Sequence, residues 1–88
     1  MAKYTNLSAS ALIRTGGGKL SGFIINSHSS GTLKLWDNTS AASTIIMNTF
    51  TFPAGSGVYR FEPVDFYTGL YATIGGTADI TLIWEPNS

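Results

Sequence analysis

Residues 69–84, GLYATIGGTADITLIW, determine the expected fold class. Threonine, isoleucine and aromatic side chains follow one another there without helical periodicity, which favours strand over helix. The pair Gly75-Gly76 divides the stretch in two, and a glycine pair between two strands favours a two-residue hairpin turn. We therefore predict a β-hairpin with strands over 70–74 and 77–84.

Residues 22–36, GFIINSHSSGTLKLW, repeat the same order of features. Both stretches begin with glycine, continue as a strand, pass through a turn and a Gly-Thr pair, and end at a tryptophan followed by an acidic residue. Segment 27–31 is the predicted hairpin loop of this copy. The similarity predicts two related hairpins at the centres of two sheets.

Runs rich in Ile, Thr, Phe and Tyr recur along the whole chain, separated by clusters of Gly, Ser, Asn and Pro. A spacing of roughly eight to twelve residues is typical of an all-β sandwich or barrel. The chain is therefore predicted to be all-β, a small antiparallel β-sandwich of jelly-roll-like form with about eight short strands, in one domain over 1–88. The expected strands are 4–7, 9–14, 19–26, 32–36, 44–52, 58–61, 70–74 and 77–84.

Charge and composition exclude several classes of partner. Five Lys and Arg balance five Asp and Glu, and without a basic field neither nucleic acid nor an anionic membrane is an expected partner. The chain has no cysteine and one histidine, which excludes disulfides and metal sites built from several of these residues. We expect no metal, cofactor or small-molecule substrate. No apolar run is long enough for a signal peptide or membrane helix, so we expect a protein made and kept in a cytoplasm.

Three predicted strands carry large apolar side chains on both faces. In 77–84, alternation puts Leu82 and Trp84 on one face with Ile80, and Ile83 on the other. In 19–26, one face carries Leu20 and Ile24, and the other carries Phe23 and Ile25. In 44–52, one face carries Ile46, Phe50 and Phe52, and the other carries Ile45 and Met47.

One sandwich core cannot bury both faces, and a domain of this size has a marginal core of its own. We expect another subunit or a larger assembly to cover the second face. The alternative is that loops and the N-terminal segment cover it internally. The residues expected at a protein interface are Trp36, Ile45, Met47, Tyr59, Phe66, Tyr67, Ile83 and Trp84.

No group of residues indicates an enzyme. His28 lies among serines in 27–31, but sequence neighbours seldom have the geometry of a nucleophile and its base, and a solvated turn histidine is the favoured interpretation. Glu62 and Asp65 flank a Pro-Val pair where no cleft is expected. Segment 16–19, GGGK, lacks the spacing and the helix of a phosphate loop. We expect no catalytic activity.

Three segments resemble small all-β proteins of tailed bacteriophages: SGTLKLWDNTS at 30–40, NTFTFPAG at 48–55 and TGLYATIGGTADIT at 68–81. Some proteins of that type are capsid decoration, or cement, proteins, which bind the outside of the head between capsomers. The resemblance implies a non-enzymatic virion protein that stabilises the capsid. Its implied partners are the major capsid protein and further copies of itself, as a dimer or trimer. Its implied location is the capsid surface, after synthesis in the host cytoplasm.

The alternative is a glycan-binding or host-attachment module on the head or tail surface. Trp36 or Trp84 would then provide a stacking platform for a sugar ring. Sugar sites also gather Asp, Asn and Gln, and this chain has no Gln. Protein interfaces are enriched in Trp and Tyr, so the interface interpretation is favoured.

Overall fold

The computed structural model describes residues 3–86, which form six β-strands and no helix. Every strand pair is antiparallel, so the all-β, antiparallel prediction is confirmed. The strands are β1 (Lys3–Leu7), β2 (Ala11–Thr15), β3 (Gly18–Trp36), β4 (Ile45–Thr51), β5 (Gly57–Phe66) and β6 (Gly69–Pro86).

Two long strands, β3 and β6, form the centre of the sheet. They pair with each other from Gly18↔Pro86 at one end to Trp36↔Tyr71 at the other. The predicted segments on either side of each expected turn therefore belong to one continuous strand. This is why residues 3–86 form six strands where eight short ones are expected.

The two predicted hairpins are wrong. Segment 27–31 lies inside β3, and Gly75-Gly76 lies inside β6. Instead of each stretch folding back on itself, the two stretches pair with one another. Turn residues favour a reversal only locally, and the long ladder between distant strands overrides that preference.

Where segment 27–31 of β3 lies beside Gly75-Gly76 of β6, glycine and serine allow the two strands to bend rather than to reverse direction. Within segment 25–32 the register between β3 and β6 shifts twice, between Ile25 and Ser27 and again between Ser29 and Thr32. Gly76 has a φ of 69° and Ser30 a φ of 53°, in the left-handed region that favours glycine. A Cβ added at Gly76 would overlap the carbonyl oxygen of Ser30. The two strands thus come very close together at the bend.

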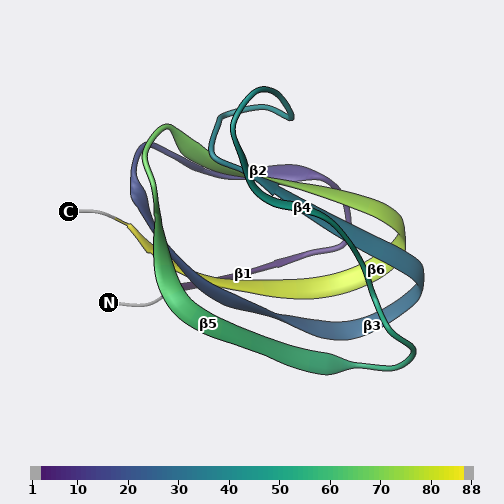
Figure 1. Cartoon of the computed structure of the whole chain (residues 1–88). Coiled ribbons are helices and arrows are strands. Elements are labelled where there is room, and N and C mark those ends of the chain that lie inside the picture. Colours follow the sequence, from purple (N-terminus) through teal and green to yellow (C-terminus); the bar gives the residue numbers. More distant parts are fainter. Residues whose placement is uncertain (1–2, 87–88) are drawn as a thin grey trace.

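Strands β3 and β6 together form a long two-stranded ribbon, and the four shorter strands pair with its two halves. β1 pairs with the C-terminal half of β6, and β5 pairs with the N-terminal half of β3. β2 pairs with the N-terminal half of β6, and β4 pairs with the C-terminal half of β3. Figure 1 shows β3 and β6 curving together, with β2 and β4 on one side of the molecule and β1 and β5 on the other.

A single apolar cluster draws on both halves of the ribbon. Where the strands are regular, alternation predicts the inner face correctly: Leu33 and Leu35 of β3 are buried, and so are Ile80, Leu82 and Trp84 of β6. The other buried members of the cluster are Leu7, Leu20, Phe23, Ile25, Phe52, Phe66, Leu70, Ala72 and Ala78.

A β-bulge buries one residue that alternation places outside. The register of β3 shifts between Leu20 and Gly22 against both β5 and β6. Leu20 therefore faces the core together with Phe23 and Ile25, all at most 2% exposed. The prediction that Leu20 lies opposite these two residues is wrong because a bulge resets the alternation of a strand.

Strand β4 differs from its prediction in the same way. Its register against β3 shifts twice, and Ile46, Met47 and Phe50 all pack against the core. Alternation predicts Met47 on the opposite face. Ile45 is 43% exposed and does face outward. Part of the apolar surface that seems two-faced in the sequence is thus covered internally.

Asp37 fixes the turn between β5 and β6. Its carboxylate accepts hydrogen bonds from the backbone amides of Tyr67 at 2.9 Å, Thr68 at 2.8 Å and Gly69 at 3.3 Å. The amide of Gly16 donates to the Thr68 carbonyl oxygen at 2.9 Å. The end of β3, the connection from β2 to β3 and the start of β6 are therefore tied together.

We expect Gly76→Ala to lower the free energy of unfolding by about 3 kcal/mol, because the new Cβ meets both an unfavourable φ and a backbone oxygen. Gly55→Ala is the matched control: its φ is 89° but no atom lies within 4 Å of the added Cβ. Its expected loss is about 1 kcal/mol. Urea unfolding followed by tryptophan fluorescence measures both values. Equal losses would contradict close packing at the bend.

Candidate functional site

Four apolar or aromatic side chains form a row across the outside of the sheet. Residues paired directly in an antiparallel sheet project their side chains to the same face. Leu12 on β2 pairs with Tyr71 on β6, Tyr71 pairs with Trp36 on β3, and Trp36 pairs with Ile45 on β4. We call these four residues the outer row. Leu12 and Ile45 are 44% and 43% exposed, and the two aromatic residues are half-buried.

Trp36 is held in place within the outer row. Its indole Nε1–H donates to Thr73 Oγ1 at 3.0 Å. The ammonium of Lys34 lies 4.4 Å from the ring centroid, a cation–π contact. The polar part of the indole is therefore satisfied within the chain. What remains at the surface is apolar ring area, which suits contact with another protein.

The expected interface residues do not form one patch. Trp36 and Ile45 lie in the outer row. Tyr67 is 74% exposed in the turn between β5 and β6. Ile83 is half-buried on the C-terminal half of β6, where it pairs with Tyr4 of β1. The structure therefore brings only two of the eight together in the outer row.

The other four expected interface residues lie in or against the core. Phe66 is 1% exposed and Trp84 is 8% exposed, so these two side chains offer a partner almost no surface in the single chain. The Phe66 ring fills the space where Gly18 has no side chain, 2.6 Å from an added Cβ. Met47 and Tyr59 are partly buried and pack against the core.

Sequence reasoning misses Leu12 and Tyr71 as members of this surface. Alternation in β6 contains a signal for Tyr71, because its neighbours Leu70 and Ala72 are apolar and point inward. No comparable signal exists for the row as a whole. A row depends on which residues of different strands face one another, and a single sequence does not give that register.

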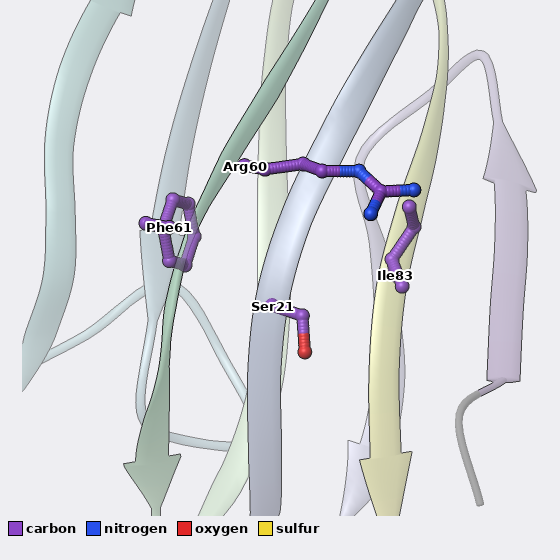
Figure 2. A pocket seen from close by; sticks show the side chains of 4 residues that line it. All are labelled: Ser21, Arg60, Phe61 and Ile83. Carbon is purple, nitrogen blue, oxygen red and sulfur yellow. The ribbon is translucent and has the colours of Figure 1, made fainter.

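A hollow of about 290 Å³ lies on the other half of the ribbon, and Figure 2 shows the four side chains that line it. Arg60 extends from β5 across β3 toward Ile83 on β6, and Ser21 and Phe61 complete the lining. No residue in 3–86 makes an ion pair or hydrogen bond with the Arg60 guanidinium. A hydroxyl and a cation without a neighbouring base do not make a nucleophilic site.

A second hollow of about 230 Å³ lies between β4 and β5. Its lining is apolar and includes core residues at its base and residues of the two strands at its sides. The lining residues are Leu20, Leu35, Ile46, Met47, Phe61 and Val64.

The imidazole ring of His28 is held by hydrogen bonds to the backbone. It lies within β3 and is half-buried, so the interpretation as a solvated turn histidine is wrong about its position. Its Nδ1 accepts a hydrogen bond from the Gly31 amide at 3.2 Å, and its Nε2 lies 2.7 Å from the Pro53 carbonyl oxygen. Nε2 therefore carries the hydrogen. Both ring nitrogens are bonded to backbone groups and neither is bonded to a serine hydroxyl.

Glu62 and Asp65, the two carboxylates considered as an acid pair, do not share an ion-pair or hydrogen-bond partner in the described chain. Asp65 forms an ion pair with Lys19 at 2.9 Å, and that hydrogen bond, with the charge of Asp65, raises the pKa of Lys19. Glu62 makes no ion pair or hydrogen bond with the described residues. Between residues 3 and 86, no three His, Cys, Asp or Glu side chains gather as metal ligands would. That part of the chain also contains no helix able to cross a membrane.

Comparisons with protein-family models, with curated proteins and with solved structures find no match for this chain. The outer row is accordingly the main observation on which a function can be argued. It presents apolar and aromatic side chains in an order set by strand pairing.

We expect His28→Ala to lower the free energy of unfolding by about 1–2 kcal/mol, because the Gly31 amide and the Pro53 carbonyl each lose a partner. Ser29→Ala is the control in the same segment, at an exposed residue, with an expected change within about 0.5 kcal/mol. Urea unfolding compares the two. If the His28 variant is as stable as the Ser29 variant, the structural role assigned to His28 is wrong.

Proposed function

We propose that the chain is a non-enzymatic structural protein of a tailed-phage virion, a capsid decoration protein that binds the outer head surface and stabilises contacts between capsomers. The observation that carries the proposal is the outer row, which crosses β2, β6, β3 and β4. A small neutral chain that exposes such a row gains free energy when a partner covers it. The resemblance of its sequence to phage proteins suggests the partners: the major capsid protein and further copies of the chain.

The proposal includes the fold, a jelly-roll sandwich of two four-stranded sheets. If each half of β3 and β6 counts as one strand, one sheet contains β1, β5 and one half of each long strand, and the other contains β2, β4 and the remaining halves. In chain order the first segment pairs with the last, the second with the seventh, the third with the sixth and the fourth with the fifth. Such nested pairing supports a jelly roll, a fold of both viral capsid proteins and lectins.

One outer row is a small contact by itself. Apolar burial contributes about 25 cal/mol per Å², and stable interfaces bury roughly 1,200–2,000 Å² in total. Loss of translational and rotational freedom offsets much of that gain. A decoration protein overcomes this limit when it touches more than one capsomer, because the first contact raises the effective concentration for the second.

A glycan-binding or host-attachment module is the second candidate, favoured by the pairing of Trp36 with Tyr71 in the outer row. Two observations weigh against it. Lys34 already lies over the Trp36 ring. Trp84, the other expected platform, is buried and donates its indole N–H to Thr5 at 2.9 Å. A sugar platform would therefore depend on Trp36 and Tyr71 alone.

We expect the double variant Leu12→Asn with Ile45→Asn to bind capsids at least roughly tenfold more weakly than the natural chain. Both side chains are more than two-fifths exposed, so the fold should tolerate the change. The measurement is cosedimentation of the purified protein with heads assembled without it. Survival of those heads on heating, with each protein added, gives the functional readout.

Tyr4→Asn is the matched control, since Tyr4 is 77% exposed on β1, outside the outer row. It should bind and protect heads like the natural chain. Heads that survive equally with and without the protein would contradict the decoration role. Saturable binding to host polysaccharide that is lost in Trp36→Ala, without any effect on heads, would support the glycan-binding alternative instead.

A further inference from the structure

Four polar side chains from three strands form a hydrogen-bonded group on the half of the ribbon that pairs with β1 and β5. They are Asn6 of β1, Asn26 of β3, and Asp79 and Thr81 of β6, and we call them the polar cluster. Asn6 Nδ2 donates to Asp79 Oδ1 at 2.7 Å and to Thr81 Oγ1 at 3.2 Å. Asn26 Nδ2 donates to the same two oxygens, at 3.2 Å and 3.1 Å. These bonds hold side chains from distant parts of the chain in one arrangement.

Strand pairing places the polar cluster on the outer face of the sheet. Ile80 of β6 is buried, so its neighbours Asp79 and Thr81 point away from the core. Asn6 pairs with Thr81, and directly paired residues project to the same face. Asn26 lies at a shift in the register of β3 against β6, where a bulge redirects a side chain. Both asparagines are exposed and the other two residues are half-buried, so a ligand can reach the cluster.

The polar cluster uses its amide donors internally and leaves acceptors free. Asn6 Nδ2 has a third acceptor, the Ile80 carbonyl oxygen at 3.1 Å, so both asparagine amides have an acceptor for each hydrogen. Within residues 3–86, no donor binds Asp79 Oδ2 or either asparagine Oδ1. Thr81 Oγ1 already accepts two N–H groups, which leaves its own hydrogen for another acceptor. The cluster therefore offers a ligand three acceptor oxygens and one hydroxyl donor.

Tyr4 provides an aromatic surface beside the polar cluster. It lies two residues before Asn6 on β1, so the two side chains project from the same face with their Cα atoms roughly 7 Å apart. Tyr4 is 77% exposed. On the other side of Thr81, the same face continues with the half-buried Ile24 and the 61% exposed Val58. Fixed hydrogen-bonding groups thus lie next to an exposed ring and apolar side chains.

We propose that the polar cluster and Tyr4 bind a neutral sugar ring. Neighbouring ring hydroxyls both donate and accept hydrogen bonds, so they can donate to Asp79 Oδ2 and accept from the Thr81 hydroxyl. The C–H face of the ring packs on Tyr4. A lysine or arginine of a partner has donors only and would leave the Thr81 hydrogen without an acceptor. A phosphate brings negative charge to Asp79, which repels it.

The sugar site is separate from the outer row and does not depend on the proposed function. The outer row lies on the half of the ribbon that pairs with β2 and β4. The glycan-binding alternative above places the sugar on Trp36 and Tyr71, in a row without Asp or Asn. The polar cluster supplies those groups on the opposite half. One partner can therefore cover the outer row while a sugar occupies the polar cluster.

The test is titration of the isotope-labelled natural chain with the methyl α-glycosides of glucose, mannose and galactose, followed by amide chemical shifts. At least one of these sugars should saturate the chain with a dissociation constant of about 1–10 mM, with shifts centred on residues 4–6 and 79–81. Asp79→Asn keeps the shape of the side chain and removes the charged acceptor. It should raise the dissociation constant about tenfold or more.

Tyr4→Ala should raise the dissociation constant about fivefold or more, because it removes the stacking surface. Its matched control is Tyr67→Ala, since Tyr67 is 74% exposed in the turn between β5 and β6. The control should bind sugar like the natural chain. The Tyr4 variant changes an exposed side chain, so it tests the site even if Asp79→Asn lowers stability.

Three results would overturn the inference: no saturation by any of the three sugars up to about 100 mM, equal binding by the natural chain and the Tyr4 variant, or equal weakening in the Tyr4 and Tyr67 variants. Binding lost in Trp36→Ala and kept in Asp79→Asn would place the sugar on the outer row instead. The titration contains no heads, and Asp79→Asn should still bind and protect them. A failure of the sugar site is therefore distinguishable from a failure of the decoration role.

Discussion

Every other strand of the described chain depends on the pairing of β3 with β6. β1 and β2 attach only to β6, and β4 and β5 attach only to β3. The core draws on both halves of this ribbon, so a slip in its register would release both halves and expose the core at once. The strands are far apart in the sequence, and closing such a connection costs chain entropy. Asp37 stabilises the pairing at its Trp36↔Tyr71 end, because three amides of the turn that leads into β6 bind its carboxylate.

The fold also requires the bend in the ribbon formed by β3 and β6, because a straight pair of long strands could not enclose a core. Small residues make the bend, and the connection between β4 and β5 closes over it. A Cβ on Gly31 would lie 2.8 Å from the Phe52 ring and 3.2 Å from Ala78 Cβ. The Phe52 amide donates to the Gly31 carbonyl oxygen at 3.0 Å, and His28 reaches the Pro53 carbonyl oxygen. A sequence that favours a reversal when taken alone becomes a packed corner, because these distant contacts outweigh its local turn preference.

Local chemistry predicts the strands and their inner faces, and it fails where the information is non-local. Alternation identifies Leu33 and Leu35 as core residues because β3 is regular there. It misplaces Leu20, since a bulge depends on the partner strands and leaves no mark on the hydrophobic pattern. The same limit applies to the candidate site. Alternation indicates that Trp36 and Tyr71 each face outward, but their position side by side follows only from the register of β3 against β6. The two-residue period of a strand shows which of its residues share a face, but it does not show which residues of other strands they pair with.

The long ribbon also determines how the outer row can be used. The outer row lies on the half of the ribbon that pairs with β2 and β4, so the order of its side chains is fixed by strand pairing rather than by a flexible linker. A chain with zero net charge has little long-range electrostatic selectivity. The shape and order of these apolar and aromatic side chains would therefore supply the specificity that charge does not.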